Sequence, residues 1–215
     1  MKDVLIKRDD PEYPANLHRQ LGDNAPLVLY TRGNIAALRA EMIGLVCSIQ
    51  CPGSIVIKTF DAIRALRDDG VVVIGGFHSP MERECLDILL RGDQPVILCP
   101  ARTLHGLRLG KRPRQALNTG QLLLVSMFDE SVRRTTVQQA VARNELVAAI
   151  AGAVFMPHAS PGGKSWGIVA TAIERGQGVF TFEDEENTPL LQAGAETLSS
   201  PIELHKQGIK WGSAW

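Results

Sequence analysis

Residues 69–92, DGVVVIGGFHSPMERECLDILLRG, contain the pattern that decides the fold. Residues 71–74 form a short, wholly apolar run, which is typical of a strand buried on both faces of a parallel sheet. Gly75 and Gly76 end this strand, and Ser79-Pro80-Met81-Glu82 predicts the start of a helix with a capping box. A strand, a glycine turn and a helix N-terminus in this order place free backbone N–H groups at the strand's carboxyl end, where they can hold a phosphate or another anion.

The same alternation of short apolar runs and amphipathic segments continues along the chain. We predict further strands over residues 42–47, 95–99, 122–125, 153–156 and 178–182. Residues 55–67, the segment from Thr135 or Thr136 to about Ile150, and residues 165–175 predict helices, whereas residues 101–115 read as an irregular basic stretch. This alternation indicates an α/β fold with a doubly wound, Rossmann-like and mainly parallel sheet.

The pattern divides the chain into three parts. Residues 1–37 are expected to form a short N-terminal extension packed on the core, with a short helical piece and one strand. Residues 38–200 hold the Rossmann-like domain, and residues 201–215 form a C-terminal tail that carries Trp211 and Trp215. A chain of 215 residues is large enough to bury a core without disulfides or structural metals.

Composition and charge exclude several classes of protein. The formal net charge is zero, so any attraction to nucleic acid must be local, and attraction of the whole molecule to a membrane is not expected. The sequence shows no signal peptide and no apolar run near 18 residues, which predicts a cytoplasmic location. The four cysteines favour reduced thiols. Cys47 and Cys51 have no second Cys or His pair at zinc-like spacing, so we expect no metal site. We also expect no cofactor.

The ligand site of a doubly wound sheet lies outside the carboxyl ends of its strands, near the point where the strand order reverses. Four predicted loops, residues 48–54, 75–80, 126–136 and 158–165, each lead to a helix N-terminus and are expected to meet there. The residues that we predict to bind DNA or a nucleotide are Ser48, Gly53, Ser54, Gly75, Gly76, Phe77, His78, Ser79, Glu82, Arg102, Arg133, Arg134, Arg143, Asn144, Gly162, Gly163, Lys164 and Ser165.

Basic side chains are clustered although the net charge is zero. Six basic or histidine residues fall within residues 102–114, and Arg133 and Arg134 precede the longest predicted helix after that stretch. Such cations beside several helix N-termini could bind the phosphates of a nucleic-acid backbone, but a solvated, highly charged loop explains the cluster of basic residues equally well. Phe77 and Trp166 could stack on bases or could belong to the core.

No residue is predicted to be catalytic. The sequence lacks a G-x-S-x-G elbow, a Walker A loop and a G-x-G-x-x-G fingerprint. Ser79 and Ser165 are better explained as helix caps than as nucleophiles. Glu82 could supply a carboxylate for acid–base work, although its place in a capping box is the simpler interpretation.

Several motifs, in order, resemble the DprA/Smf family of DNA-processing proteins. Y-P-x-x-L at Tyr13, followed by P-x-V-L-Y-x-x-G-N from Pro26, is similar to that family's N-terminal motifs. Residues 75–83, GGFHSPMER, occupy the place of the family's S-G-x-A-x-G-I-D loop. Residues 143–147, RNELV, resemble the R-N-R-I-I helix, and residues 163–180 are similar to S-G-S-L-x-T-A…G-R-x-V-F, with Gly194-Ala195 after them.

The resemblance covers roughly residues 10–200 and implies a non-enzymatic role in DNA processing and recombination. It implies binding of single-stranded DNA, formation of a homodimer and loading of a RecA-type recombinase. One departure bears on that role: the family's V-G-S-R reads Val46-Cys47-Ser48-Ile49 here, so the arginine that contacts DNA in the family is replaced by Ile49.

A second hypothesis is a small-nucleotide pocket that senses or hydrolyses its ligand. The related phosphoribohydrolases carry P-G-G-x-G-T-x-x-E, which Pro161-Gly162-Gly163 resembles. Here Ser165, Trp166 and Val169 stand where that motif has Gly, Thr and Glu. The missing carboxylate argues against that hydrolytic chemistry, which would leave Glu82 as the candidate acid–base group.

Overall fold

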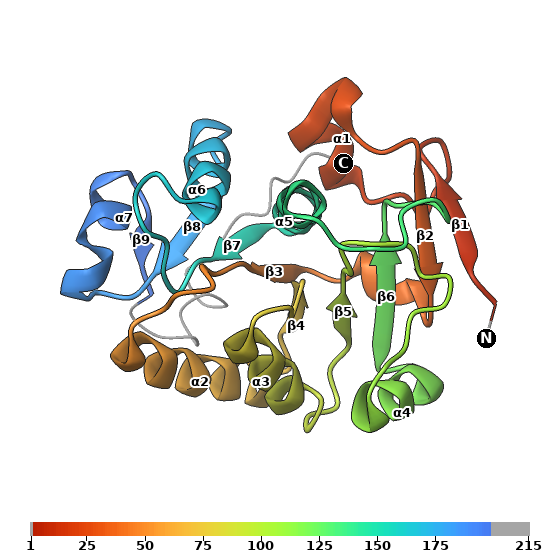
Figure 1. Cartoon of the computed structure of the whole chain (residues 1–215), viewed down its shortest axis with the longest axis horizontal. Coiled ribbons are helices and arrows are strands. Elements are labelled where there is room, and N and C mark those ends of the chain that lie inside the picture. The colour runs from red at the N-terminus through yellow and green to blue at the C-terminus, as the bar shows by residue number, and fades with distance from the viewer. Residues whose placement is uncertain (1, 199–215) are drawn as a thin grey trace.

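The computed structural model describes residues 2–198, in which nine strands form one sheet in the order β1-β2-β6-β5-β4-β3-β7-β8-β9 (Figure 1). The predicted tail over residues 201–215 lies outside the described residues. The strands are β1 (Val4–Lys7), β2 (Val28–Arg32), β3 (Met42–Leu45), β4 (Val72–Gly75), β5 (Val96–Leu98), β6 (Leu122–Ser126), β7 (Ala153–Phe155), β8 (Gly178–Thr181) and β9 (Glu196–Thr197).

All strands from β3 to β9 run parallel, whereas β1 pairs antiparallel with β2, and β2 pairs antiparallel with β6. The predicted α/β, doubly wound and mainly parallel sheet is therefore confirmed. The chain winds outward from β3 to β6 in one direction and then returns to β7 on the other side of β3. This reversal between β3 and β7 is the point at which such sheets bind ligands.

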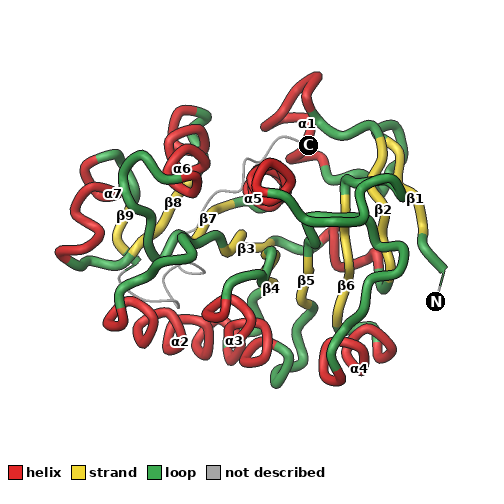
Figure 2. Tube along the Cα trace, viewed as in Figure 1, coloured by secondary structure: helices red, strands yellow, loops and turns green. Residues whose placement is uncertain are grey.

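Helices cover both faces of the sheet, as the trace in Figure 2 shows. The α-helices are α1 (Ala15–Leu21), α2 (Gly53–Asp68), α3 (Pro80–Leu89), α4 (Lys111–Thr119), α5 (Val137–Ile150), α6 (Lys164–Glu174) and α7 (Thr188–Gln192); the 3-10 helices are η1 (Gly22–Asn24), η2 (Ile35–Arg39) and η3 (Glu185–Asn187). Helices α1, α5 and α6 lie on one face, and α2, α3 and α4 lie on the other (Figure 1).

Each face of the sheet has its own hydrophobic core. In β4, the side chains of Val72 and Ile74 join the core under α1, α5 and α6, and Val73 joins the core under α2, α3 and α4. Successive side chains of a strand point to opposite faces, so a strand buried on both sides must be apolar at every position. This requirement explains the continuous apolar run at residues 71–74.

Two parts of the fold differ from the sequence-based expectation. Strand β1 was not predicted, although its sequence VLIK begins with three apolar residues; three of its four residues are exposed, Val4 and Leu5 among them. The predicted irregular stretch over residues 101–115 is wrong at its end, because α4 begins at Lys111. Pro113 hides this helix in the sequence, but proline is tolerated in the first helical turn, where its missing N–H has no intrahelical partner.

Candidate nucleic-acid interface

A cavity of about 460 Å³ opens at the carboxyl ends of β3, β4 and β7, between the loops after these strands and helix α5; we call it the rim pocket. Its position is the reversal of strand order described above. Its lining residues are Cys47, Ser48, Ile49, Gln50, His78, Ser79, Glu82, Val137, Ala140, Val141, Arg143, Asn144, Ser160, Gly162, Gly163, Lys164 and Ser165. Ten of the predicted binding residues are among them.

The loops after β3 and β7 are joined directly at this pocket. The backbone N–H of Ser48 donates to the carbonyl oxygen of His158 at 3.0 Å, and the thiol of Cys47 donates to the same carbonyl at 3.6 Å. These bonds continue the pairing of the adjacent parallel strands beyond their ends. Segments more than a hundred residues apart in the chain therefore form one wall.

Arg143 supplies a buried positive charge to the pocket. It extends from α5 with only 3% of its surface exposed, and its Nη1 donates to the carbonyl oxygen of Cys99 at 3.0 Å. Gly76 lies against the guanidinium, where a side chain would overlap it. Burial lowers the pKa of Arg143, and the charge of Glu82 opposes that shift. The Nε–H of Arg143 has no partner within residues 2–198.

Ser79 and Glu82 form the predicted capping box at the start of α3. The Ser79 hydroxyl accepts from the N–H of Glu82, while the Glu82 carboxylate accepts from the N–H groups of Ser79 at 2.9 Å and His78 at 3.1 Å. The buried carboxylate therefore accepts hydrogen bonds from backbone N–H groups at a helix N-terminus, where negative charge is stabilised. This arrangement favours the structural role for Glu82 over the acid–base role.

The loop after β7 brings a second helix N-terminus to the pocket. Helix α6 begins after Gly163, and no side chain caps it. The exposed cation of Lys164 and the backbone N–H groups of this first turn lie beside the pocket. The interpretation of Ser165 as a cap is wrong, because Ser165 is the second residue of the helix and is buried.

Helix α2 also begins differently from the prediction. Gly53 and Ser54 were predicted to lie in the loop before this helix, but both lie inside α2, whose N-cap is Pro52. Neither residue lines the rim pocket. Ile55 to Leu66 carry the apolar spacing that predicted the helix, whereas Gly53 and Ser54 before them are exposed and not apolar, so nothing in the pattern marked them as helical.

Phe77 does not present its ring to the pocket. It is buried in the core beneath α2 and α3, and its backbone has a positive φ of 46°, a conformation that L-residues rarely adopt. Gly75 and Gly76 likewise lie outside the pocket lining, and the Phe77 ring packs against Gly75. Trp166 is half-buried against the core on the other face. Base stacking by Phe77 is therefore excluded.

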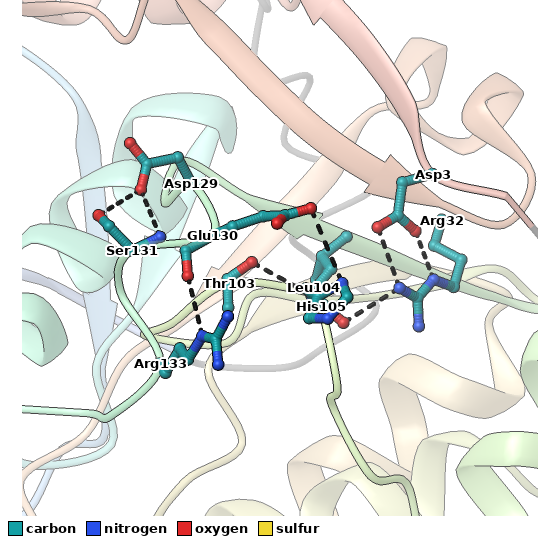
Figure 3. Close-up of polar contacts among 9 residues, drawn as sticks. All are labelled: Asp3, Arg32, Thr103, Leu104, His105, Asp129, Glu130, Ser131 and Arg133. Carbon is teal, nitrogen blue, oxygen red and sulfur yellow. Dashed lines mark hydrogen bonds and ion pairs between the residues drawn. The ribbon is translucent and has the colours of Figure 1, made fainter.

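The remaining predicted cations lie apart from the pocket. Arg133 folds back on its own loop, where its Nε donates to the carbonyl oxygen of Glu130 at 3.4 Å (Figure 3). The N–H of Thr103 donates to the carbonyl of Val132 at 2.8 Å, which ties this loop to the one after β5. Neither Arg102 nor Arg134 lines the rim pocket, and loop 126–136 contributes no lining residue.

Several residues at or beside the pocket were not among the predicted binding residues. Ile49 and Val137 are large apolar side chains with 76% and 55% of their surfaces exposed. His158 is buried, and its ring contacts Asn187 and Ser160. The position of His158 just after a predicted strand was a usable signal, because side chains at strand carboxyl ends face the ligand site. Asn187, from a different segment, gave no such signal.

The chemistry of the described residues offers little to a metal ion. Among residues 2–198, no group of three or more His, Cys, Asp or Glu side chains is placed to bind a metal. Cys47 and Cys51 do lie together, and a hydrogen bond between them raises the pKa of Cys47 and lowers that of Cys51.

Within residues 2–198, no helix is both long and apolar enough to cross a membrane.

Comparisons with solved structures find the same fold. DNA processing protein A (DprA) from Streptococcus pneumoniae superposes with a TM-score of 0.80 at 19% identity, covering 96% of this chain and 75% of that one. DNA processing protein A from Helicobacter pylori, a protein described by its single-stranded DNA binding mode, gives 0.78 at 16%, covering 98% and 97%. The molybdenum cofactor binding protein from Rippkaea orientalis gives 0.54 at 16%, covering 80% and 98%.

The sequence itself decides the family. No curated protein matches the chain. The sequence model of a family described as DNA recombination-mediator protein A, however, matches residues 4–207, which is almost the whole chain. The order of motifs noted in the sequence agrees with this match, as does the shared fold. The chain belongs to the DNA recombination-mediator protein A (DprA) family.

Proposed function

We propose that this protein binds single-stranded DNA at the rim pocket and acts in DNA processing without catalysing a reaction on the DNA. The observation that carries the proposal is the meeting of two cations, Arg143 and Lys164, with the uncapped N-terminus of α6 in one cavity. Phosphate groups are bound by such combinations of basic side chains and helix N-termini. Membership of the DprA family supports DNA as the source of the phosphates.

Exposed apolar side chains at the same pocket favour a ligand that has bases as well as phosphates. Ile49 and Val137 both line the pocket, one in the loop after β3 and the other at the start of α5. Unpaired bases present apolar faces, which a duplex keeps stacked inside. The pocket therefore suits a single strand better than a double helix.

A mononucleotide is the second candidate ligand, because the cavity volume lies in the range of small-molecule sites. Hydrolysis of such a nucleotide by Glu82 is disfavoured, since its carboxylate already accepts from two backbone N–H groups. A homodimer, a RecA-type recombinase as partner, a role in recombination and a cytoplasmic location belong to the same proposal and rest on the family.

The test is a salt series of fluorescence anisotropy titrations with a labelled oligonucleotide. For single strands, each phosphate contact contributes about 0.7 to the slope of log K against log salt. We expect Lys164→Ala to lower the slope by about that amount and to weaken binding at every salt concentration. Lys7→Ala is the matched control, because Lys7 is an exposed lysine on β1, at the far edge of the sheet.

Two further ligands sharpen this experiment. A duplex of the same length should bind more weakly than the single strand, and a mononucleotide should compete poorly. An unchanged slope in Lys164→Ala would remove Lys164 from the site. Tight binding of a mononucleotide with no binding of oligonucleotides would favour the small-nucleotide pocket instead.

A further inference from the structure

Three side chains form a connected row that ends in the rim pocket. The Ser160 hydroxyl lies 3.4 Å from Nε2 of His158, and Nδ1 of His158 lies 3.0 Å from Oδ1 of Asn187. His158 and Asn187 are buried, whereas Ser160 is exposed and lines the pocket. The row therefore runs from the interior of the protein to the site where a ligand would lie.

The orientation of Asn187 decides which nitrogen of His158 carries the proton. The Asn187 amide nitrogen donates to the carbonyl oxygens of Pro157 at 2.9 Å and Phe182 at 3.4 Å. Its Oδ1 is therefore the atom that faces His158, and this oxygen can only accept a hydrogen bond. Nδ1 must then hold a hydrogen, so Nε2 of the neutral imidazole presents its lone pair to Ser160.

A serine hydroxyl beside such a lone pair is the arrangement of an activated nucleophile, with an oriented histidine as its base. The role of the third group can be filled by asparagine, as in the Cys-His-Asn proteases. We propose that Ser160 is a nucleophile, that His158 is its general base with Asn187 as positioning residue, and that the rim pocket hydrolyses small carboxylic esters whose acyl part carries a negative charge.

The charge of the proposed substrate follows from the surroundings of Ser160. Gly163 and Lys164, at the start of α6, line the same cavity as Ser160, as does Arg143. The N–H of Gly163 already donates to the carbonyl oxygen of Ser160 at 3.0 Å. The backbone N–H groups of Lys164 and Ser165, in the first turn of α6, have no intrahelical partners, so they can stabilise the oxyanion of a tetrahedral intermediate. The two cations then remain to hold an anionic group elsewhere in the acyl part.

The reaction balances without a cofactor. As Oγ of Ser160 attacks the carbonyl carbon, its proton passes to Nε2 of His158; the ester C–O bond then breaks, and His158 returns the proton to the departing alcohol. Water attacks the acyl-serine in the second half, losing a proton to His158, and the acid leaves as Ser160 recovers its proton.

The separation of 3.4 Å between Oγ of Ser160 and Nε2 of His158 is long for proton transfer, which is efficient at about 2.6–3.2 Å. The exposed Ser160 side chain must therefore move a few tenths of an ångström towards His158, and catalysis is expected to be slow. A covalent probe detects such a nucleophile more sensitively than turnover does. This proposal does not depend on DNA binding, since the probe is used without DNA.

The test is labelling of the full chain with a fluorophosphonate, which forms a bond from Ser160 Oγ to phosphorus and expels fluoride. We expect one adduct, located by mass spectrometry on Ser160, that is lost in Ser160→Ala and reduced at least tenfold in His158→Gln. Ser131→Ala is the control, because Ser131 is an exposed serine whose hydroxyl bonds to Asp129 and not to a histidine. No adduct, or one that persists in Ser160→Ala, would overturn the proposal.

Two further measurements keep the roles of His158 and Asn187 separate from a merely structural effect. In Ser160→Cys, the thiol replaces the hydroxyl in an exposed position that tolerates it, and the pH profile of its alkylation rate should differ from that of the double variant Ser160→Cys/His158→Gln. Asn187→Ala should move that pH profile. The charge preference is tested by comparing 4-nitrophenyl acetate with mono-4-nitrophenyl succinate: faster hydrolysis of the succinate is expected, and equal rates would refute the anionic substrate.

Discussion

The guanidinium of Arg143 lies against the backbone of Gly76, in the place that a side chain at residue 76 would occupy. The glycine that follows β4 is therefore needed for the close approach of a cation from α5, rather than for an unusual backbone angle. This relationship links the strand at the centre of the fold to the charge in the rim pocket.

Gly76→Ala tests the relationship. The new methyl group must displace the guanidinium, so the bond from Arg143 to the Cys99 carbonyl is lost or strained. We expect the free energy of unfolding to fall by about 1–3 kcal/mol, measured by urea denaturation, and oligonucleotide binding to weaken. Gly167→Ala is the control: nothing lies near its Cβ position in α6, so stability should rise by about 0.5–1 kcal/mol. Equal effects of the two substitutions would contradict the account.

Ile49 permits a gain-of-function test of the rim pocket. Its side chain is 76% exposed beside the pocket, so Ile49→Arg adds a cation there with little effect on folding. We expect tighter binding of single-stranded DNA and a salt slope steeper by about 0.7, measured by anisotropy. The matched control is Ile57→Arg, since Ile57 is 65% exposed on α2 and does not line the pocket. If both variants gain equally, the effect is one of net charge and not of the site.

Much of the fold was predictable because a strand that is buried on both faces must be apolar at every position. Residues 71–74 are apolar at every position, and Ser79 and Glu82 have the spacing of a capping box at the start of a helix. The structure has both the buried strand β4 and the capping box of α3. Loops 48–54, 75–80 and 158–165 contribute to one pocket, because parallel strands leave all their carboxyl ends on one rim. Strand β1 was missed because its apolar run is only three residues long, Val4 to Ile6, and lies between charged residues.

The side chains of the site were less predictable than its location. Arg133 resembles a phosphate-binding residue in sequence, yet its direction depends on a loop held by Thr103, thirty residues earlier. Phe77 resembles a stacking residue, but its positive φ turns the ring into the core. The contact of His158 with Asn187 joins segments 29 residues apart. Tertiary packing sets all three directions, and local pattern carries no information about them.

Thiol reactivity should distinguish the four cysteines. The hydrogen bond with Cys47 lowers the pKa of half-buried Cys51, whereas burial raises the pKa of Cys85 and of Cys99 to about 12. Because the thiolate is the reactive form, we expect iodoacetamide at pH 8 to alkylate Cys51 first. Peptide mass spectrometry measures the rates. Cys47→Ala should slow the alkylation of Cys51, while Cys47→Ser keeps a donor and should preserve it; faster labelling of Cys47 would contradict the prediction.

The ion pair between Lys58 and Asp184 joins α2 to the loop after β8 and should be visible in the pH dependence of stability. Lys58 Nζ lies 2.6 Å from Asp184 Oδ2, and hydrogen bonds from Lys58 and from the Glu186 N–H lower the pKa of Asp184. Since the folded pKa lies below the unfolded value of about 3.9, the contribution of Asp184 to stability is present above that value and is lost as pH falls through the folded pKa.

Lys58→Ala should therefore raise the pKa of Asp184, measured by carboxyl-carbon NMR, and the difference in stability between the two proteins should shrink as pH falls below about 4. Asp129 is the internal reference, because its lowered pKa depends on Ser131 and should not move in Lys58→Ala. A parallel shift at Asp129 would mean that the substitution acts through the general charge of the protein and not through the pair.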